Sequence, residues 1–301
     1  MEQRIEKGIN AYLVDGPNVL VTARRTPLSP ELQPARFGSM ANDGGNLIVE
    51  VDEYDTVAAD PVAAKYLRPF KGSRELVRGL DRWCLWLADG FDAADLEKSP
   101  VLRERISTVR DVRAASKRQA TADLARTPHL FGEIRQPDHD YLCIPSVVSE
   151  SRPYYTATQL GTRTIASNLA FTVSDPSGLS FALISSSMFI TWQRTVGGRL
   201  ESRLRFSTLT WNTFPVPDLD EKVRQRIIDA GKKVLDARAL HPERSLAEHY
   251  NPLAMAPELL KAHDDLDREV DKAFGAPRKL TTERQRQELL FANYVVLTEG
   301  A

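Results

Sequence analysis

The chain has 301 residues, a length that predicts about two domains and is enough to bury a core. With 42% hydrophobic and 27% charged residues, its composition is typical of a folded globular protein and excludes a disordered or fibrous one. Forty basic residues stand against forty-one acidic ones, and this formal net charge of −1 excludes a wholly basic, histone-like nucleic-acid binder.

The cellular compartment follows from the cysteines and from the apolar runs. Cys84 and Cys143 are far apart and form no CxxC, which excludes a disulfide framework and a zinc site and favours the reducing cytoplasm. The charged first ten residues lack an apolar core, so we expect no secretory signal. No run approaches the roughly 18 apolar residues of a membrane span, so we expect no contact with a membrane.

The first 217 residues predict a mixture of strands and helices. Short apolar runs rich in Val, Ile, Thr and aromatic residues alternate there with turn clusters. The candidate strands are Tyr12–Leu20, Leu47–Val51, Trp83–Leu87, Tyr141–Ile144, Ile165–Ala166 extending to Val173, and Phe181–Ile184.

Residues 101–126 contain neither Gly nor Pro and predict one long amphipathic helix. Its positive charges outnumber its negative ones, which is compatible both with an ordinary solvated helix face and with a surface that contacts phosphates. The two interpretations stay open at this point. The cations are Arg103, Arg105, Arg110, Arg113, Lys117, Arg118 and Arg126.

The pattern becomes helical after the segment PVPDLDEK at residues 215–222. Asp218 or Asp220 is a suitable N-cap for the first helix of this part, and the last helix can begin at Thr281 or Thr282. The sequence therefore predicts an α+β protein in which a mixed α/β domain over residues 1–217 precedes a small helical domain over residues 218–301.

Searches for catalytic motifs find none. The chain has no GxGxxG or Walker A loop, no NPPY-type tetrapeptide and no GxSxG elbow. The histidines show no metal-binding spacing, and we interpret His241 and His249 as surface residues. The segment Pro137–Asp140 could open a nuclease site, but no acidic-x-Lys follows it, and we interpret it as a turn. We therefore expect neither catalytic nor metal-binding residues.

The most informative segment is RLESRLRF at residues 199–206. In a single strand its alternation would place Arg199, Glu201, Arg203 and Arg205 on one face, with the apolar residues mostly behind them and Gly197–Gly198 as the preceding turn. Arg suits the N7 and O6 acceptors of guanine, and Glu accepts from the amino group of cytosine, so a Glu-x-Arg pair could read one C·G pair. The pattern favours DNA recognition over a solvated sheet edge.

Several long segments resemble the C-terminal part of MmeI-like restriction–modification enzymes, which join an endonuclease, an adenine-N6 DNA methyltransferase and a target recognition domain. The resemblance extends from about Ile9 to Leu297. The segments that carry it are INAYLVDGPNVLV (9–21), NDGGNLIV (42–49), AAKYLRPFKGSRELVRGLDRWCLWL (63–87), VRAASKRQATADLARTPHLFGEIRQP (112–137), SSSMFITWQRTVGGRLESRLRFS (185–207), WNTFPVP (211–217) and SLAEHYNPLAMAPELLKAHDDLDREVDKAFG (245–275).

The resemblance implies that residues 1–217 are a target recognition domain and that residues 218–301 are the family's helical C-terminal domain. It implies double-stranded DNA as the partner, with Glu201 and Arg203 reading an outer base. It also implies that Arg205 reads a further base together with Asn168 and Leu169.

Contacts to the DNA backbone are expected from a second group of cations. The resemblance implies this role for three residues in strongly marked stretches, and the excess of arginine after residue 185 adds two more. They are Lys117, Arg118 and Arg135, and then Arg194 and Arg199.

The chain departs from the family because its methyltransferase and nuclease motifs are absent. We expect the chain to begin just after the methyltransferase domain would end, with S-adenosylmethionine and Mg²⁺ needed only in the missing catalytic domains. Four functions stay open: a recognition module or fragment of the methyltransferase, an active methyltransferase by itself, a specificity subunit that works with a methyltransferase or endonuclease chain encoded upstream, and a scaffold that does not bind DNA.

Overall fold

The computed structural model describes residues 8–14 and 16–299, and their backbone divides into two compact units. Among the described residues, unit 1 comprises 8–14, 16–36, 140–159 and 173–299, and unit 2 comprises 37–139 and 160–172. The α+β fold predicted from the sequence is confirmed. Because the C-terminal helices fall within unit 1, the functional boundary between residues 217 and 218 does not coincide with a boundary between units, and it stays a prediction.

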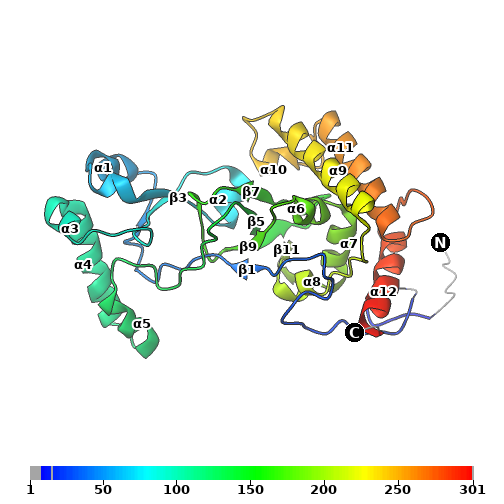
Figure 1. The fold of residues 1–301 in the computed structure, drawn as a ribbon, viewed down its shortest axis with the longest axis horizontal. Coiled ribbons are helices and arrows are strands. Elements are labelled where there is room, and N and C mark those ends of the chain that lie inside the picture. The colour runs from blue at the N-terminus through cyan, green and yellow to red at the C-terminus, as the bar shows by residue number, and fades with distance from the viewer. Residues whose placement is uncertain (1–7, 15, 300–301) are drawn as a thin grey trace. The chain divides into compact units, whose positions relative to one another are not determined.

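Unit 1 is mainly helical, and its C-terminal part is built on the pair α9 and α11, which lie side by side (Figure 1). Helix α9 begins at the N-cap Asp220, whose carboxylate accepts from the Val223 amide, as the sequence predicts. Gly231 in α9 allows α6 to approach closely, since a Cβ at this position would lie 2.6 Å from the Cβ of Ala182. The helices are α6 (Leu179–Ile184), α7 (Ser187–Val196), α8 (Thr208–Asn212), α9 (Glu221–Ala239), α10 (Leu246–His249), α11 (Pro257–Ala273) and α12 (Glu283–Glu299).

The core of unit 1 is rich in aromatic side chains. Trp192 of α7 packs edge-on against Phe291 of α12, and Phe189 packs against Trp211 and Phe214. These rings are buried, and an aromatic side chain contributes much of the apolar area that a core removes from water. This packing holds α7 in place, and α7 leads directly into the strands described below.

The sheet of unit 2 packs with helices over a second apolar core. This sheet has the strand order β2-β4-β3-β8, in which only the β3–β8 pair is parallel. Its strands are β2 (Ile48–Val49), β3 (Leu67–Lys71), β4 (Trp83–Leu85) and β8 (Ile165–Ala166). Its helices are α1 (Tyr54–Ala59), η1 (Ala63–Tyr66), α2 (Ser73–Arg78), α3 (Ala94–Lys98), α4 (Pro100–Ala114), α5 (Gln119–Asp123) and η2 (Leu124–Arg126).

Two further sheets complete the strand inventory of the described residues. One sheet, in unit 1, has the order β10-β11-β6, with β6 (Val147–Ser149), β10 (Gly198–Leu200) and β11 (Arg203–Arg205). The other has the order β1-β9-β5-β7, and the boundaries of the units fall within three of its strands. These strands are β1 (Arg36–Phe37), β5 (Tyr141–Pro145), β7 (Thr158–Leu160) and β9 (Ala170–Ser174).

Several predicted elements are wrong. Phe181–Ile184 is part of helix α6, because the whole segment is buried and a fully apolar run suits a buried helix as well as a strand. The predicted helix over residues 101–126 is interrupted after Ala114 and continues only as the short helices α5 and η2. The described part of Tyr12–Leu20 contains no strand, and Asp15 lies outside the described residues. Within residues 8–14 and 16–299, no helix is long and apolar enough to cross a membrane.

Candidate nucleic-acid interface

The segment at residues 199–206 forms a hairpin and not the single strand that the sequence predicts. Strand β10 pairs antiparallel with β11, and Glu201 and Ser202 form the connecting turn. Glu201 has a φ of +55°, so the chain reverses there, whereas the predicted turn residues Gly197 and Gly198 are the C-cap of α7 and the first residue of β10. A residue other than Gly adopts such a φ only at some energetic cost, and the strand pairing of the hairpin offsets this cost.

The hairpin changes which side chains share a face. Residues that lie opposite each other in an antiparallel pair point to the same side of the sheet, and the register pairs Leu200 with Arg203 and Arg199 with Leu204. Arg203 and Arg205 therefore share one face, as predicted, but Arg199 belongs to the opposite face, and the prediction of four charged residues on one face is wrong. Leu204 is buried as expected, whereas Leu200 is 44% exposed beside Arg203.

The third strand, β6, was missed by the sequence analysis. It pairs Ser149 with Arg203 and Val147 with Arg205, so β11 lies in the middle of this sheet. Three residues carry too little alternation to predict a strand, and only the pairing with β11 reveals it. Glu150, which follows this strand, was missed for the same reason.

The charged side chains of the hairpin region differ in the partners that they have. Glu201 pairs with Arg203 at 2.7 Å between Oε2 and Nη2, and Arg199 pairs with Glu150 at 3.2 Å. Arg194 pairs with Glu283 of α12 and donates to the carbonyls of Glu150 and Arg152, so its guanidinium already links three segments of unit 1.

Arg205 stands apart from these neighbours. It is exposed, and its guanidinium has no partner among the described residues. The backbone of the same residue is held firmly, because its carbonyl accepts from Gln193 Nε2 at 3.0 Å. Of the arginines in this region, Arg205 is thus the one whose five donors are all available to a ligand.

The two predicted reading residues of unit 2, Asn168 and Leu169, lie in a tight turn between β8 and β9. The turn is held by its backbone: the Asn168 amide donates to the Ser39 carbonyl at 2.9 Å, and the Leu169 amide donates to Ser167 Oγ at 3.1 Å. Gly38 allows this close approach, because a Cβ there would lie 2.3 Å from the Ser167 carbonyl oxygen. The Leu169 side chain is 57% exposed, and the Asn168 carboxamide has no partner within the described ranges.

The cations of residues 101–126 divide into structural and available groups. Arg113 is completely buried and donates to five main-chain carbonyls, so neither of the two interpretations, a solvated face or a phosphate-contacting surface, holds for it. Arg105 donates to two carbonyls and to Glu53, and Arg103 donates to two carbonyls. The remaining four have no side-chain partner among the described residues, and they are Arg110, Lys117, Arg118 and Arg126.

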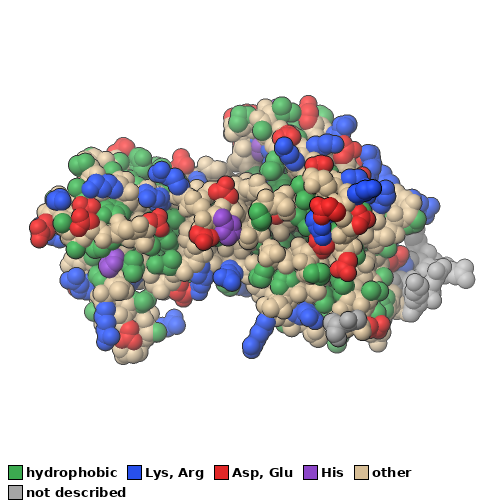
Figure 2. Space-filling model, in the orientation of Figure 1, with side chains coloured by type: hydrophobic (Ala, Val, Ile, Leu, Met, Phe, Trp, Pro, Cys, Tyr) green, Lys and Arg blue, Asp and Glu red, His purple; other side chains and the backbone are tan. Residues whose placement is uncertain are grey.

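The three predicted backbone contacts of unit 2 follow the same division. Lys117 and Arg118 lie in the exposed break between α4 and α5, where their side chains extend from the chain without a partner in the part that the structure describes. Arg135 pairs with Glu133 and donates to the Gly38 carbonyl at 3.2 Å. Figure 2 shows Lys and Arg interspersed with Asp and Glu on the face that it displays. The cations available to a ligand are therefore those without a protein partner, and not those of one charged patch.

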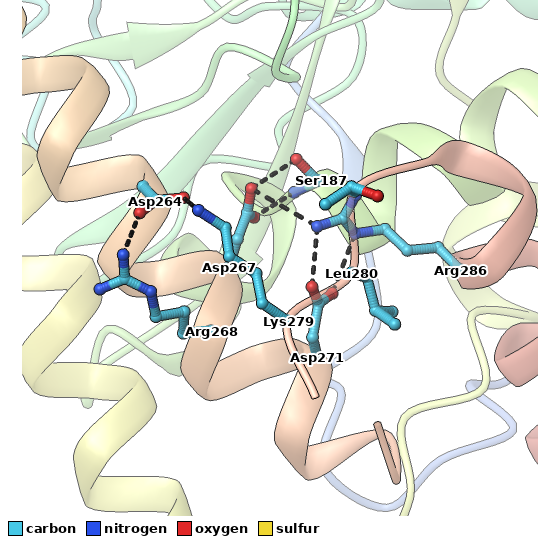
Figure 3. A pocket seen from close by; sticks show the side chains of 9 residues that line it. Ser187, Asp264, Asp267, Arg268, Asp271, Lys279, Leu280 and Arg286 are labelled. Atoms are coloured by element: carbon cyan, nitrogen blue, oxygen red, sulfur yellow. Dashed lines mark hydrogen bonds and ion pairs between the residues drawn. The ribbon is translucent and has the colours of Figure 1, made fainter. Parts of the chain in front are cut away.

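A pocket of about 250 Å³ in unit 1 gathers three aspartates (Figure 3). Asp271 accepts from Arg286, Asp264 from Lys279 and Arg268, and Asp267 from the amide and hydroxyl of Ser187. Burial raises the pKa of Asp267 to about 6. Because protein donors already hold every one of these carboxylates, the arrangement is a network that joins α7, α11 and α12.

Other titratable groups are also structural. Burial raises the pKa of the Cys143 thiol to about 12 and raises that of Cys84 as well, which disfavours the reactive thiolate. His249 is buried, which corrects its interpretation as a surface residue, because Ser245 starts the short helix α10 and turns His249 inward. No group of three or more His, Cys, Asp and Glu side chains suited to a metal ion occurs within residues 8–14 and 16–299.

Comparison with known proteins assigns the chain to a family. Residues 15–218 match the family model described as the MmeI target recognition domain, and residues 219–300 match the model of the MmeI C-terminal domain. The chain belongs to the MmeI family. The resemblance stated from the sequence motifs is thereby confirmed.

Two longer relatives define how much of an MmeI-family enzyme this chain represents. It is 35% identical over 299 residues to DNA methyltransferase A of Bacillus subtilis (strain 168), covering 99% of this chain and 34% of that protein. It also matches the type IIL restriction–modification enzyme MmeI, solved in complex with DNA, with a TM-score of 0.89 and 39% identity. That match covers 97% of this chain and 39% of the MmeI chain. The chain thus spans between a third and two fifths of these MmeI-family relatives.

Proposed function

We propose that this chain reads the sequence of double-stranded DNA for an adenine-N6 DNA methyltransferase of a restriction–modification system. In this function it positions the target base for a methyltransferase domain that its own sequence does not contain. The observation that carries the proposal is the hairpin β10–β11, which places Arg203 and Arg205 next to each other on one face of a three-stranded sheet. The relatives support it, because one is a DNA methyltransferase and the other was solved with DNA.

The division of labour follows from the chemistry of the available groups. Arg203 and Arg205 can each donate two hydrogen bonds to the N7 and O6 atoms of guanine, while Glu201 can accept from the amino group of cytosine. The Glu201–Arg203 ion pair, at 2.7 Å, places a carboxylate acceptor beside a guanidinium donor, and reading the two halves of one base pair needs one group of each kind. Asn168 and Leu169 are proposed to read a further base with Arg205.

The unpartnered cations would position the module on the phosphate backbone without reading sequence. Lys117 and Arg118 fit this role best, since neither has a competing protein partner in the described structure. Arg135, Arg194 and Arg199 are proposed for the same role, although each would have to exchange an existing ion pair for a phosphate.

The test is selection of bound duplexes from a random-sequence pool, followed by sequencing of the bound fraction. We expect an enriched motif that contains C·G pairs, and we expect Arg205→Ala to lose about 1–3 kcal/mol of discrimination at one position of it. Lys233→Ala is the control, because Lys233 is an exposed cation of α9 without a partner in the part of the chain that the structure describes. Failure to enrich any motif, in the chain alone and when fused to the rest of a relative, would refute the proposal.

A second candidate is a separate specificity subunit that works with a methyltransferase or endonuclease chain. It stays beside the first candidate because the chain matches only 34% and 39% of the lengths of the two relatives. Co-expression with the unmatched part of DNA methyltransferase A tests it: a stable complex with restored methylation supports a subunit, and the absence of both refutes it.

The cofactor and compartment belong to the same proposal. S-adenosylmethionine and Mg²⁺ are expected to bind the catalytic domains of the complete enzyme, so calorimetric titration of this chain with S-adenosylmethionine should show no binding. The functional boundary between residues 217 and 218 and a location in the cytoplasm, with the DNA, are proposed with it.

A further inference from the structure

The start of helix α2 is joined to the turn at residues 167–169. Ser73 Oγ donates to the Leu169 carbonyl, and Ser73 is itself buried. A Cβ at Gly72 would lie 2.8 Å from Ser167 Oγ and 3.5 Å from the Cβ of Leu169. Gly72 and Ser73 therefore lie directly beside the turn that presents Asn168 and Leu169.

The next residue, Arg74, differs from most cations around it. Over residues 67–82, Arg68 donates to two main-chain carbonyls, Lys71 contacts a carbonyl and an aspartate, and Arg82 pairs with a glutamate. Arg74 and Arg78 are both exposed, and neither guanidinium has a partner among the described residues, but only Arg74 directly follows Ser73. The carboxylate of the adjacent Glu75 accepts from the Gly72 amide at 2.9 Å and forms no ion pair with the Arg74 guanidinium among the described residues.

The covalent chain limits how far Arg74 can be from the turn. Its Cα is about 3.8 Å from that of Ser73, whose side chain touches the Leu169 carbonyl. A DNA strand that contacts the exposed Leu169 side chain and the free Asn168 carboxamide would thus pass within reach of an Arg side chain at position 74. The packing of Gly72 and Ser73 against the turn keeps this spacing fixed.

We propose that Arg74 is a further DNA-binding residue, which contacts a backbone phosphate of the strand that Asn168 and Leu169 approach. The proposal rests on the proposed function of the chain in reading DNA. A phosphate is favoured over a base because Arg74 lies in helix α2 beside the turn and not in the turn itself. Between half and two thirds of protein–DNA hydrogen bonds go to phosphate and sugar.

The test measures how duplex affinity depends on salt for Arg74→Ala, Arg74→Lys and the control Lys233→Ala, all in the full chain with a mixed-sequence duplex as the probe. One lost phosphate contact should make the slope of log K against log salt concentration shallower by about 0.9. We expect this change for Arg74→Ala only, with the lysine variant keeping most of the slope and with unchanged base preference. Arg74 has no side-chain partner in the described structure, so its removal should leave the thermal midpoint unchanged.

The results for Arg74 and Asn168 separate this inference from the function on which it rests. If the salt slope of Arg74→Ala equals that of Lys233→Ala, the phosphate contact is refuted. If Arg74→Ala changes the preference at one base position, the phosphate contact is also refuted, because Arg74 would then read a base. Asn168→Ala reports on the underlying function, because it should alter base preference and leave the slope unchanged. If Arg74→Ala leaves the salt slope unchanged while Asn168→Ala alters base preference, only the proposal for Arg74 is refuted.

Discussion

Arg113 offers a direct test of the division between structural and DNA-binding cations. Its guanidinium donates from Nε to the carbonyl of Asn42 at 2.8 Å, from Nη1 to those of Leu124 and Thr127, and from Nη2 to those of Ala41 and Leu130 at 2.8 and 2.7 Å. These acceptors belong to two separate stretches of unit 2, residues 41–42 and residues 124–130. The side chain therefore fixes the break after α4, in which Lys117 and Arg118 lie.

Arg113→Met would keep much of the side-chain volume and remove all five hydrogen bonds. The carbonyls of Ala41, Leu124 and Thr127 keep a backbone amide as donor, so the loss falls mainly on those of Asn42 and Leu130. Each buried carbonyl left without a donor costs about 1–3 kcal/mol. Part of this loss is recovered, because the variant no longer buries a charged guanidinium, whose pKa burial lowers. We therefore expect unit 2 to lose about 4 kcal/mol of unfolding free energy, a large part of the stability of a typical domain.

Native-state hydrogen exchange is the suitable assay because it reports the two units separately. Protection should fall in peptides that cover residues 100–130 and remain in those that cover α9 and α11. Arg110→Met is the matched control on the same helix, since Arg110 has no partner in the described residues, and its effect should lie within about 0.5 kcal/mol. Unchanged protection in Arg113→Met together with weaker DNA binding would refute the structural role of Arg113.

Three other predictions concern specificity, affinity and pH. Glu201→Lys combined with Arg203→Asp, in a complete enzyme, should exchange C for G at one position of the recognised sequence, and sequencing of methylated sites would contradict the pair's role if the site stayed the same. Lys117→Ala should weaken binding equally across sequences and make the salt slope shallower by about 0.9, whereas altered base preference in a binding selection would disprove the phosphate contact. Burial and a nearby arginine lower the pKa of His263 well below 6.5, so the contribution of His263 to stability is lost as pH falls below 6.5. Burial raises the pKa of Asp267 to about 6, so the contribution of Asp267 to stability is lost as pH rises through 6. Because the two oppose each other, Asp267→Asn should steepen the loss of unfolding free energy between pH 6.5 and 5 in denaturant titrations, and an unchanged slope would contradict this assignment.

The contrast between Arg113 and Arg118 shows where sequence reasoning stopped. Both are arginines of one charged segment, and periodicity indicated the apolar face of the helix but not which cations meet main-chain carbonyls. No Gly or Pro in the sequence predicts the interruption after Ala114. The buried Arg113 and its acceptors in other segments set the local conformation there. An interaction with an acceptor 71 residues away leaves no trace in a local pattern.

The sequence by itself determined the α+β composition and the helical C-terminal part with its cap at Asp220. It also determined the absence of a nucleotide-binding motif and the presence of the MmeI-like segments. Local propensity, capping chemistry and long collinear motifs are all properties of neighbouring residues. Only the tertiary structure decided that Glu201 reverses the chain, that Arg199 and Arg203 lie on opposite faces, and that β6 completes the sheet. A single strand and a hairpin share the same alternation of side chains up to the turn. Pairing with a strand some fifty residues away in sequence selects between them, because only that pairing satisfies the hydrogen bonds of the central strand.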